Sequence, residues 1–436
     1  MKLLKTLFLT TLLLVSVQIC AENYPYRSDM LWVTVPDHAN WLYELNQNPV
    51  VEIQVYQYGI PVEGNVTYSI GDDMLESFLH GNAKLVNGRT KIKMPGRKSP
   101  GFRDLRLEIK KDGKTYKHHI KVGFAVDRIR PVTKDPKDFD SFWRQNLEEL
   151  KKVPLEYTKV PAPEYSTDKI ECYLINLKVD QQGHSMYGYL FYPRNAQKGS
   201  CPVVLCPPGA GIKTIKNPLR HKYYAEQGMI RLEMEIHGLD PRLPQSTFNE
   251  LSHAFNANGG YLADGIENPD RYYMKHVYCG MVRCIDLLTS LPEWDGRNVV
   301  VQGGSQGGAL SIVTAALDSR VTLCAAHHPA LSDMAGYSVK GATGGYPHFN
   351  RIPGFYTPSS LRTMALYDVV NFARRVKVPT FLTWGYNDVT CPPTTTYAVW
   401  NLLTCPKESL ITPINEHWTS DDTDYKEMEW IKKRLR

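Results

Sequence analysis

The sequence lacks the cysteine spacing that metal-binding and redox motifs require. Its nine cysteines are scattered over 436 residues and form no C-x-x-C pair, which excludes zinc-ribbon and thioredoxin-like chemistry. Downstream of the N-terminal segment no run of 18 apolar residues occurs, so no transmembrane segment is expected there. Internal repeats and low-complexity segments are missing too, which excludes solenoid and disordered classes.

Composition and charge describe a globular chain with two domains. Hydrophobic residues make up 42% and charged residues 22% of the sequence, a composition that supports a sizeable core. A chain of 436 residues is too long for one ordinary domain. The formal net charge is +6, and residues 84–130 hold 15 Lys and Arg against four Asp and Glu. This region does not interleave basic and aromatic residues as a nucleic-acid platform would. We therefore expect no nucleic-acid partner and interpret the region as solvated strand faces, in preference to a surface for anionic glycans or membranes.

Residues 1–21 are interpreted as a secretory signal peptide. A basic start precedes an apolar run that is too short to span a membrane comfortably, and Ala21 is suitable for cleavage. We therefore expect an exported protein, periplasmic or extracellular. Cys20 leaves a lipid anchor as the less favoured alternative, because Ile19 is bulky for that processing. For the eight later cysteines, buried free thiols are favoured over disulfides.

Residues 22–126 are predicted to form an all-β domain. Short segments of alternating apolar and polar residues recur in it, and residues 111–114 have the composition of a hairpin turn. Six or seven such strands over about 100 residues indicate an immunoglobulin-like sandwich. No catalytic constellation is visible in this part of the sequence.

Residues 127–436 are predicted to form an α/β domain. A helix is expected from about residue 138, and residues 170–179 and 186–192 are expected to pair as a hairpin. From residue 201 onward, short β-branched segments alternate with helical ones. This succession indicates a mostly parallel sheet with helices on both faces.

A strand, a tight turn and a helix are predicted in succession over residues 299–310. The turn places Gly303, Ser305 and Gly307 in the G-x-S-x-G pattern of the α/β-hydrolase nucleophile elbow. Such an elbow holds its serine at a strained backbone angle, and glycine is needed where strand and helix come close. Ser305 is therefore the candidate nucleophile.

The candidate general base is His417. A serine nucleophile needs a base, which in this fold is the last of the three catalytic residues along the chain. His417 lies just past the final predicted strand, at the sheet edge where such sites assemble. It is favoured over His327, His328 and His348 for this position.

The candidate carboxylate that orients the base is Asp388. It lies just beyond a predicted strand end, between the serine and the histidine, as the chain order requires. Asp333 is less favoured because it follows the strand next to the elbow, one strand before the strand after which the acid is expected. Asp368 is expected to face solvent on a helix.

Two backbone N–H groups are needed for an oxyanion hole. Gln306, at the start of the helix after the serine, supplies one. The glycine-rich loop 207–211 supplies the second, for which Ala210 is the candidate. Three histidines near strand ends are candidates for the substrate pocket: His237, His327 and His328.

Further motifs are spaced over residues 135–430. In chain order they are Asp138-Phe139-Asp140-x-x-Trp143, the run Gly303 to Ala309, Asp318-Ser319-Arg320-Val321, Asp388-x-x-Cys391-Pro392-Pro393 and Glu416-His417. Together they resemble the acetyl xylan esterase/cephalosporin C deacetylase family of α/β-hydrolases. The resemblance implies Ser305 as nucleophile, Asp388 as acid and His417 as base. It implies metal-independent, cofactor-free removal of acetyl groups from O-acetylated carbohydrates, which makes an acetylated oligo- or polysaccharide the expected substrate partner.

The chain departs from the family pattern at two loops. Pro208-Gly209-Ala210 stands where the family usually has His-Gly-Tyr, and residues 236–240 replace an Arg-Gly-Gln-Gly run. Because that tyrosine helps enclose the acyl group in the family, both acetyl and other small acyl groups remain candidates for the group that is removed. The family's tendency to form oligomers likewise leaves a homo-oligomer open. Two alternatives to a secreted serine esterase are retained: a prolyl-oligopeptidase-like peptidase and a catalytically inactive glycan-binding protein.

Overall fold

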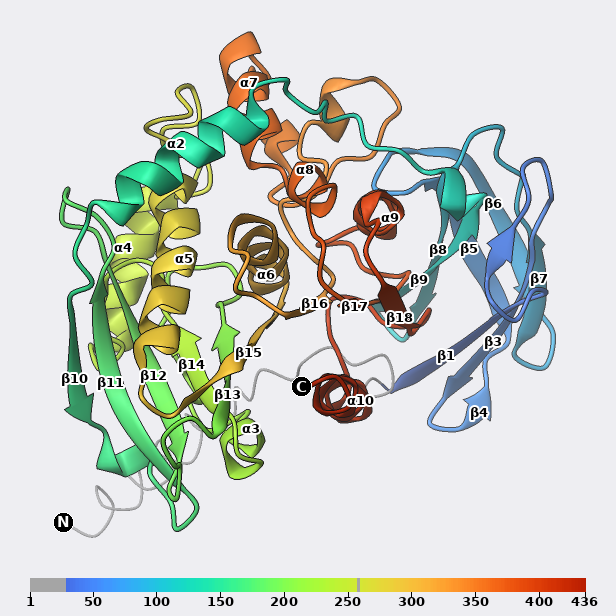
Figure 1. Cartoon of the computed structure of the whole chain (residues 1–436). Helices are drawn as coiled ribbons and strands as arrows, with labels where there is room; N and C mark the ends of the chain where they lie inside the picture. The colour runs from blue at the N-terminus through green and yellow to red at the C-terminus, as the bar shows by residue number, and fades with distance from the viewer. Residues whose placement is uncertain (1–28, 257–258) are drawn as a thin grey trace, which may run out of the picture. The chain divides into compact units, whose positions relative to one another are not determined.

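A computed structural model describes residues 29–256 and 259–436 of the chain (Figure 1). The predicted signal peptide and Cys20 lie outside the described residues. The backbone divides into two compact units. The smaller unit contains the described residues up to Gly71, Ser77–Lys98 and Arg103–Val122, and the larger contains Asp72–Glu76, Ser99–Phe102 and Gly123–Arg436. No helix in the described ranges is long and apolar enough to cross a membrane.

The smaller unit consists mainly of two β-sheets. One has the order β1-β3-β4 with β7 paired to β3, and the other has the order β2-β9-β8-β5-β6. In β3, Val51, Ile53 and Val55 are fully buried and alternate with partly exposed residues, because successive side chains of a strand point to opposite faces. The strands are β1 (Met30–Pro36), β2 (Leu42–Tyr43), β3 (Val50–Gln57), β4 (Ile60–Pro61), β5 (Gly64–Asp72), β6 (Ser77–Leu85), β7 (Arg89–Lys93), β8 (Gly101–Lys111) and β9 (Lys114–Phe124).

The larger unit is built on a nine-stranded sheet with the order β10-β11-β12-β14-β13-β15-β16-β17-β18. The strands from β14 to β18 along this order pair in parallel, whereas β10, β11, β12 and β14 pair antiparallel. The predicted parallel sheet and the hairpin of β11 and β12 are thus confirmed. The strands are β10 (Tyr157–Pro161), β11 (Ile170–Lys178), β12 (Ser185–Pro193), β13 (Cys201–Cys206), β14 (Ile230–Met234), β15 (Trp294–Gly304), β16 (Leu323–His327), β17 (Thr380–Trp384) and β18 (Lys407–Ile411).

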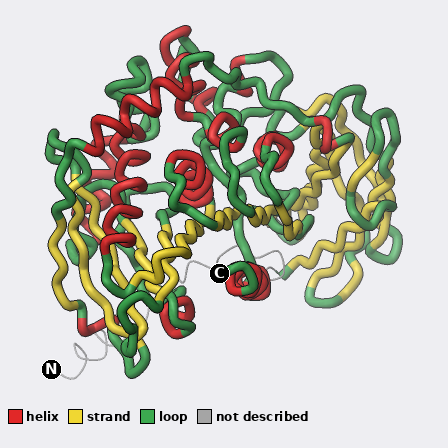
Figure 2. The backbone as a smooth tube through the Cα atoms, viewed as in Figure 1, coloured by secondary structure: helices red, strands yellow, loops and turns green. Residues whose placement is uncertain are grey.

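Helices cover both faces of this sheet (Figures 1 and 2). On one face α5 and α6 contact β13, β15 and β16, and on the other α3 and α10 contact β12, β14, β16 and β17. Under α3 and α10, Val204 and Val300 pack with Tyr224 and Trp430 in one buried cluster. The helices are α2 (Phe139–Lys151), α3 (Tyr223–Glu226), α4 (Gln245–Asn256), α5 (Met274–Ser290), α6 (Gln306–Leu317), α7 (Pro358–Tyr367), α8 (Val369–Ala373), α9 (Pro393–Leu402) and α10 (Asp421–Lys432).

Two short segments from the N-terminal β region belong to the larger unit. In Asp72–Glu76, the Asp73 carboxylate accepts hydrogen bonds from the N–H and hydroxyl of Thr394 at 3.3 and 2.7 Å. In Ser99–Phe102, the Phe102 ring packs against Tyr386 and Tyr397, with centroid distances of 5.0 and 5.6 Å. Both segments therefore contact the stretch that follows β17.

All eight cysteines within the described residues are free thiols, and seven of them are buried. The preference for free thiols over disulfides is confirmed for these eight, and the expected burial is confirmed for seven of them. Burial raises the pKa of the Cys206 and Cys284 thiols, so these side chains behave as small hydrophobic residues.

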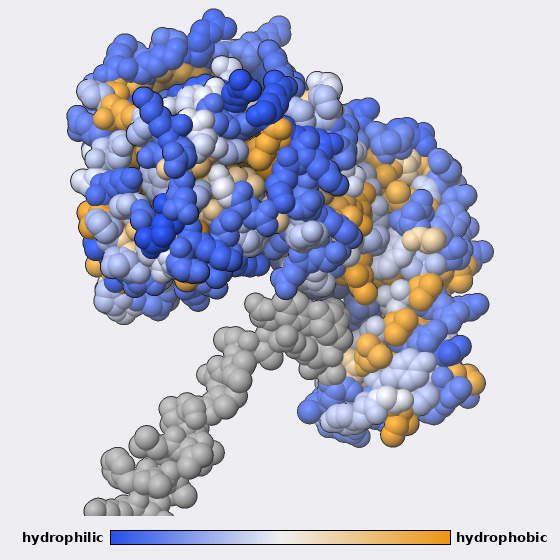
Figure 3. Space-filling model, turned by 60° about the horizontal axis from the view of Figure 1, so that its bottom comes forward, coloured by the Kyte–Doolittle hydropathy of each residue, from blue (hydrophilic) through white to orange (hydrophobic). Residues whose placement is uncertain are grey.

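Hydrophobic residues on the surface are scattered. The face shown in Figure 3 is mostly hydrophilic, with hydrophobic residues in small separated groups. Single exposed apolar residues are normal on globular proteins. In open α/β sheets, ligands bind outside the carboxyl ends of the strands, so the functional site of this chain is expected at that edge of the parallel strands.

Candidate active site

Ser305 lies between the end of β15 and the start of α6, as the predicted strand, turn and helix require. Its backbone has φ 60° and ψ −122°, a strained conformation for a residue with a side chain. Three backbone hydrogen bonds hold it: the Ser305 N–H donates to the His327 carbonyl, and the Ser305 carbonyl accepts from the N–H groups of Ala309 and Ala330, all at 3.0 Å. The elbow is thus fixed by contacts to β16, to the loop after β16 and to α6.

Glycine is required next to the serine because other backbone segments come very close. A Cβ at Gly307 would lie 2.4 Å from the Pro207 carbonyl oxygen, and a Cβ at Gly308 would lie 2.5 Å from the His327 carbonyl oxygen. Real Cβ atoms do not approach other atoms so closely. The glycines therefore allow the elbow to pack between the ends of β13 and β16.

The structure brings Ser305, His417 and Asp388 together. The Ser305 hydroxyl lies 3.0 Å from His417 Nε2, and His417 Nδ1 lies 2.8 Å from Asp388 Oδ2. Because a carboxylate only accepts hydrogen bonds, Nδ1 carries a proton and donates to Asp388, which leaves Nε2 to accept from the serine hydroxyl. This is the arrangement in which an imidazole can remove the proton of a nucleophilic serine.

Asp388 is fully buried but well supplied with donors. Its Oδ1 accepts hydrogen bonds from the N–H groups of Thr390 and Cys391 at 2.7 and 2.8 Å. Burial alone would raise the pKa of this carboxyl, but the hydrogen bond and charge of His417 hold it below its usual value. Asp388 is therefore a carboxylate at neutral pH and can orient the imidazole.

The two other aspartates weighed in the sequence lie away from the base. Asp368 was expected to face solvent, and this expectation is wrong: it is fully buried and accepts hydrogen bonds from the N–H groups of Asp333 and Met334 at 2.8 and 2.6 Å. Asp333 in turn accepts from the N–H groups of Val132 and Thr133 at 3.0 and 2.8 Å. Both carboxylates satisfy buried backbone donors, a structural role.

The loop after β13 lies against the elbow. The Pro207 carbonyl approaches Gly307, and a Cβ on Gly209 would lie 4.0 Å from the Gly304 carbonyl oxygen. A hydrogen-bond chain joins this loop to the helix after the serine: the Gly211 N–H donates to the Tyr261 hydroxyl at 3.1 Å, and that hydroxyl donates to Gln306 Oε1 at 2.5 Å. The loop containing Ala210 and the N-terminus of α6 are thereby held together, as a two-donor oxyanion hole needs.

The three pocket histidines lie in three different environments. His328 packs against the His417 ring, with centroids 4.3 Å apart, and burial and that neighbour lower its pKa to about 3. His327 instead points to Glu427 on α10, whose carboxylate lies 2.6 Å from Nε2. His237 follows β14 and contacts the loop after β13, with Nε2 3.3 Å from the Gly211 carbonyl. His328 is the member of this set that touches His417, the candidate base.

Sequence reasoning did not find three side chains that support the site. Glu427 binds His327, Tyr261 bridges Gln306 and Gly211, and Asp73 binds Thr394 at the start of α9. Each acts across 45 or more positions of the chain, so no local pattern reports it. For Glu427, the one signal in the sequence was the acidic and aromatic character of the C-terminal helix.

Within residues 29–256 and 259–436, one group of side chains could hold a metal ion. His328, Asp388 and His417 each offer one ligand atom, all within 4.8 Å of one another. Both ring nitrogens of His417 are, however, already engaged with Asp388 and Ser305. A cation bound here would compete with the hydrogen bonds that join these three residues.

Comparisons with known proteins agree on one family. The family described as acetyl xylan esterase (AXE1) matches residues 125–434. Acetyl esterase Axe7A from Xylanibacter ruminicola is 57% identical over 416 residues, which covers 95% of this chain and 93% of that protein. The similarity to Axe7A thus extends through the N-terminal β region.

Solved structures resemble this chain over most of its length. The acetyl xylan esterase from Paenibacillus sp. R4 has 27% identity and a TM-score of 0.61, and the match covers 71% of this chain and 98% of that one. Acetyl xylan esterase 1 from Thermoanaerobacterium sp. JW/SL YS485 has 21% identity and the same TM-score, over 71% and 97%. The predicted α/β-hydrolase fold is confirmed by these matches.

Proposed function

Since this chain belongs to the acetyl xylan esterase (AXE1) family and is a carboxylic ester hydrolase, we propose that it removes acetyl groups from O-acetylated carbohydrates through a Ser305–His417–Asp388 triad. The observation that carries the mechanism is the continuous line of hydrogen bonds, 3.0 Å from serine to histidine and 2.8 Å from histidine to aspartate. The acetyl and carbohydrate specificity rests on the names of the relatives that this chain resembles.

In the acylation step the Ser305 oxygen attacks the ester carbonyl carbon while His417 Nε2 takes the hydroxyl proton. The negative charge that develops on the carbonyl oxygen is stabilised by the N–H groups of Gln306 and Ala210. Asp388 stabilises the imidazolium and keeps the ring in position. As the tetrahedral intermediate collapses, His417 protonates the leaving sugar oxygen and an acetyl-serine remains.

In the deacylation step a water molecule attacks the acetyl-serine carbonyl, with His417 as its base. Collapse of the second tetrahedral intermediate returns the proton to Ser305 and releases acetic acid. The strained backbone of Ser305 points its side chain out of the elbow, so the hydroxyl is open to the ester and the acetyl-serine carbonyl is open to water. This cycle needs no group beyond the side chains and backbone amides named.

Replacement of the nucleophile tests the mechanism. Ser305→Ala is expected to lower the release of acetate from 4-nitrophenyl acetate and acetylated xylan by at least about 10⁴-fold, with an unchanged circular dichroism spectrum. A fluorophosphonate should label the parent protein on Ser305 and leave the variant unlabelled, as judged by peptide mass spectrometry. Substantial residual turnover in Ser305→Ala would refute the role of this serine.

The same assays separate the alternatives weighed from the sequence. Hydrolysis of prolyl peptides in place of acetylated xylan would favour the peptidase. Glycan binding without fluorophosphonate labelling would favour an inactive binding protein. A series of aryl esters from acetate to hexanoate, with acetate preferred, would support acetyl specificity at the altered loop 208–210.

We further propose that the protein is exported after cleavage of residues 1–21. The support is the basic and apolar N-terminal sequence that ends at Ala21. When the full chain is expressed in a host that has a secretion pathway, N-terminal sequencing of the purified protein should show that it starts at residue 22. Retention of Met1, or an acylated Cys20, would contradict this proposal.

A further inference from the structure

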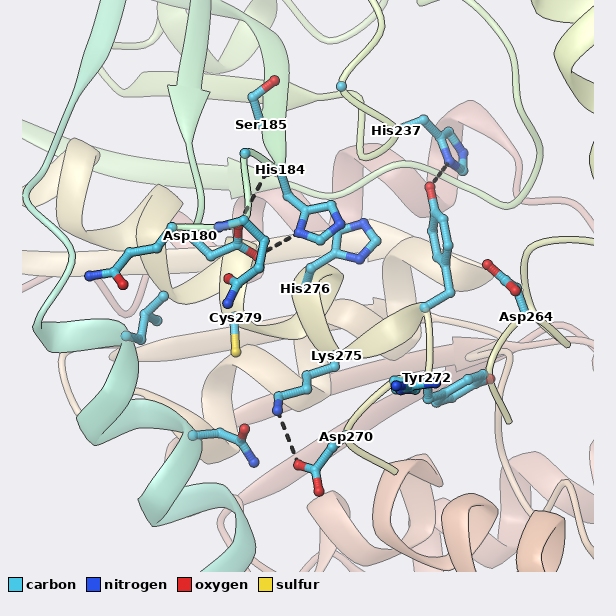
Figure 4. Close-up of a pocket in the computed structure, with 18 of the residues that line it drawn as sticks. Asp180, His184, Ser185, His237, Asp264, Asp270, Tyr272, Lys275, His276 and Cys279 are labelled. Atoms are coloured by element: carbon cyan, nitrogen blue, oxygen red, sulfur yellow. Dashed lines mark hydrogen bonds and ion pairs between the residues drawn. The ribbon is translucent and has the colours of Figure 1, made fainter. Parts of the chain in front are cut away.

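A cavity of about 850 Å³ opens at the carboxyl edge of the sheet. It is bordered by α2, α4, the start of α5, the turn between β11 and β12, and the residues that follow β14 (Figure 4). None of its lining residues belongs to the triad. Its volume lies within the roughly 300–1,000 Å³ typical of small-molecule sites. The triad mechanism leaves this cavity without a role.

Two stacked imidazoles form the centre of the cavity (Figure 4). The rings of His184 and His276 are 4.3 Å apart and nearly parallel, with an interplanar angle of 6°. Asp180 fixes His184 by accepting from its Nδ1 at 2.6 Å and from its backbone N–H at 3.1 Å. No described residue forms a hydrogen bond with the His276 ring, so its nitrogen atoms are available to a ligand.

His237 and Tyr273 form a polar wall that faces the catalytic loop. The Tyr273 hydroxyl donates to His237 Nδ1 at 2.7 Å, and His237 Nε2 donates to the Gly211 carbonyl at 3.3 Å. Burial lowers the pKa of His237 to about 4, and burial with the neighbouring His184 lowers that of His276 to about 3. Both rings are therefore uncharged near neutral pH; the ring nitrogens of His237 are held by Tyr273 and Gly211, whereas a neutral His276 ring can donate one hydrogen bond and accept another.

Most charged groups around the cavity are already paired. Lys275 binds Asp270 at 3.1 Å, and Lys152 binds Glu149 at 2.6 Å. What remains is a set of neutral imidazoles, a phenol and aromatic ring faces, with the Asp264 carboxylate and the Arg271 guanidinium, both exposed and of opposite charge, beside them. Such a set suits a ligand with many hydroxyl groups, apolar C–H faces and no net charge, which describes a neutral carbohydrate.

The cavity lies along the same edge as the nucleophile. His237 follows β14, Gly211 follows β13 and Ser305 follows β15, and these three strands are neighbours in the order β14-β13-β15. Neighbouring strands are about 4.8 Å apart, so the ends of β14 and β15 are about 10 Å apart. A sugar chain whose ester lies at Ser305 would enter the cavity by extending past the loop after β13.

We propose that this cavity is a glycan subsite, in which His276, Tyr273 and Asp264 bind neutral sugar units of the chain whose ester group lies at Ser305. The inference rests on the proposed esterase function and adds where the rest of the substrate binds. Binding energy gained there, away from the reacting ester, holds the ester group in place. The subsite makes the enzyme favour esters carried on an oligosaccharide over small aryl esters.

Binding is tested first, without catalysis. Xylotetraose is titrated by calorimetry into Ser305→Ala protein and into the same protein carrying His276→Ala or Asp264→Asn. The side chain of Asp264 is exposed, so this second variant should fold normally if His276→Ala does not. Each added change should weaken binding by about tenfold, the effect of losing one or two good hydrogen bonds. The control is His253→Ala, an exposed histidine on α4 outside the lining of the cavity, which should bind like the parent.

Steady-state kinetics then test whether the cavity contributes to ester hydrolysis. In the active enzyme, His276→Ala and Asp264→Asn should raise KM for acetylated xylo-oligosaccharides while changing kcat little. The ratio of kcat/KM for the oligosaccharide ester to that for 4-nitrophenyl acetate should fall by about tenfold. His253→Ala should leave both activities and their ratio unchanged.

The outcomes separate this inference from the proposed function. Equal xylotetraose binding by parent and cavity variants, or no binding by either, overturns the subsite whatever the esterase does. Stronger binding of a glucuronic acid-bearing oligosaccharide than of xylotetraose overturns its neutral character. Cavity-dependent binding by a protein that releases no acetate from acetylated xylan would instead refute the proposed function and leave the glycan site standing.

Discussion

His327 and Glu427 form a buried pair in which the ring Nε2 lies 2.6 Å from the carboxylate oxygen, with side chains 7% and 1% exposed. Glu427 also accepts a hydrogen bond from Gln302 of β15 at 3.0 Å. The His327 carbonyl, in turn, holds the N–H of Ser305. This pair therefore attaches α10, the helix after His417, to the strand ends that support Ser305.

Glu427→Gln should destabilise the protein, most strongly at low pH. Burial tends to lower the pKa of His327, but the charge and hydrogen bond of Glu427 outweigh it and the pKa is raised. The pair's contribution is therefore complete below the unfolded value of about 6.5 and is lost as pH rises through the folded value. Urea unfolding at pH 6 should show a loss of about 3 kcal/mol, as for other broken buried pairs, and the loss should shrink by pH 9.

A matched control lies two positions further along the same helix. Glu429 forms a partly exposed ion pair with Lys432, and such surface pairs contribute between 0 and about 1 kcal/mol. Glu429→Gln should therefore change stability little at either pH. A pH-independent loss in Glu427→Gln would show that the pair does not depend on a protonated His327.

Asp388→Asn should leave the fold intact and lower kcat by about 10⁴-fold, because an amide can turn the imidazole into the wrong tautomer. The measurement is kcat and KM for 4-nitrophenyl acetate, with the melting temperature as a check on folding. The oxygen of the new amide can still accept the hydrogen bonds that the N–H groups of Thr390 and Cys391 donate. A loss below tenfold would remove Asp388 from the catalytic residues.

Gly307→Ala should cost both stability and activity. The added methyl group would lie 2.4 Å from the Pro207 carbonyl oxygen, so the loop or the helix must shift, and overpacking of this kind costs about 1–3 kcal/mol. At Gly209 the nearest atom would be 3.8 Å away, and Gly209→Ala should keep or slightly raise the free energy of unfolding. Equal stability of the two variants would contradict the close packing of the elbow.

Asp73→Ala should weaken the start of α9. Pro392, the residue before this helix, supplies no side-chain cap, and the Asp73 carboxylate takes that place at Thr394. Loss of a cap costs about 1 kcal/mol, and kcat should fall because α9 begins two residues after Cys391, which holds Asp388. Urea unfolding and kcat measure the two effects. Glu76→Ala, an exposed change in the same segment, should leave both unchanged.

The parts of the site that follow a local rule could be predicted from the sequence. The G-x-S-x-G turn forces a strand, a strained serine and a helix into a run of about ten residues. The chain order of acid and histidine then leaves few candidates after each strand. Ser305, Asp388 and His417 could be identified because each stands at a strand end, and strand ends of a parallel sheet meet at one edge.

The pair His327 and His328 shows why neighbouring residues could not be told apart. His327 is the last residue of β16 and meets α10, whereas His328 leaves the strand with a φ of 28° and meets His417. Which face each takes depends on the register of β16, and an Ala-Ala-His-His sequence contains no alternation that reveals it. The contact of Asp73 with Thr394 spans 321 positions and is set only by tertiary packing.

The close approach at Gly307 and the open space at Gly209 divide this site into a part that does not tolerate a larger residue and a part that does. Changes at 307 break the nucleophile support, whatever the substrate. At 209 a side chain can be introduced while the serine keeps its geometry, because the nearest atom would lie 3.8 Å from the added Cβ. Divergence in the accepted acyl group can therefore accumulate in the loop after β13, and a mutant library aimed at bulkier esters should be directed there.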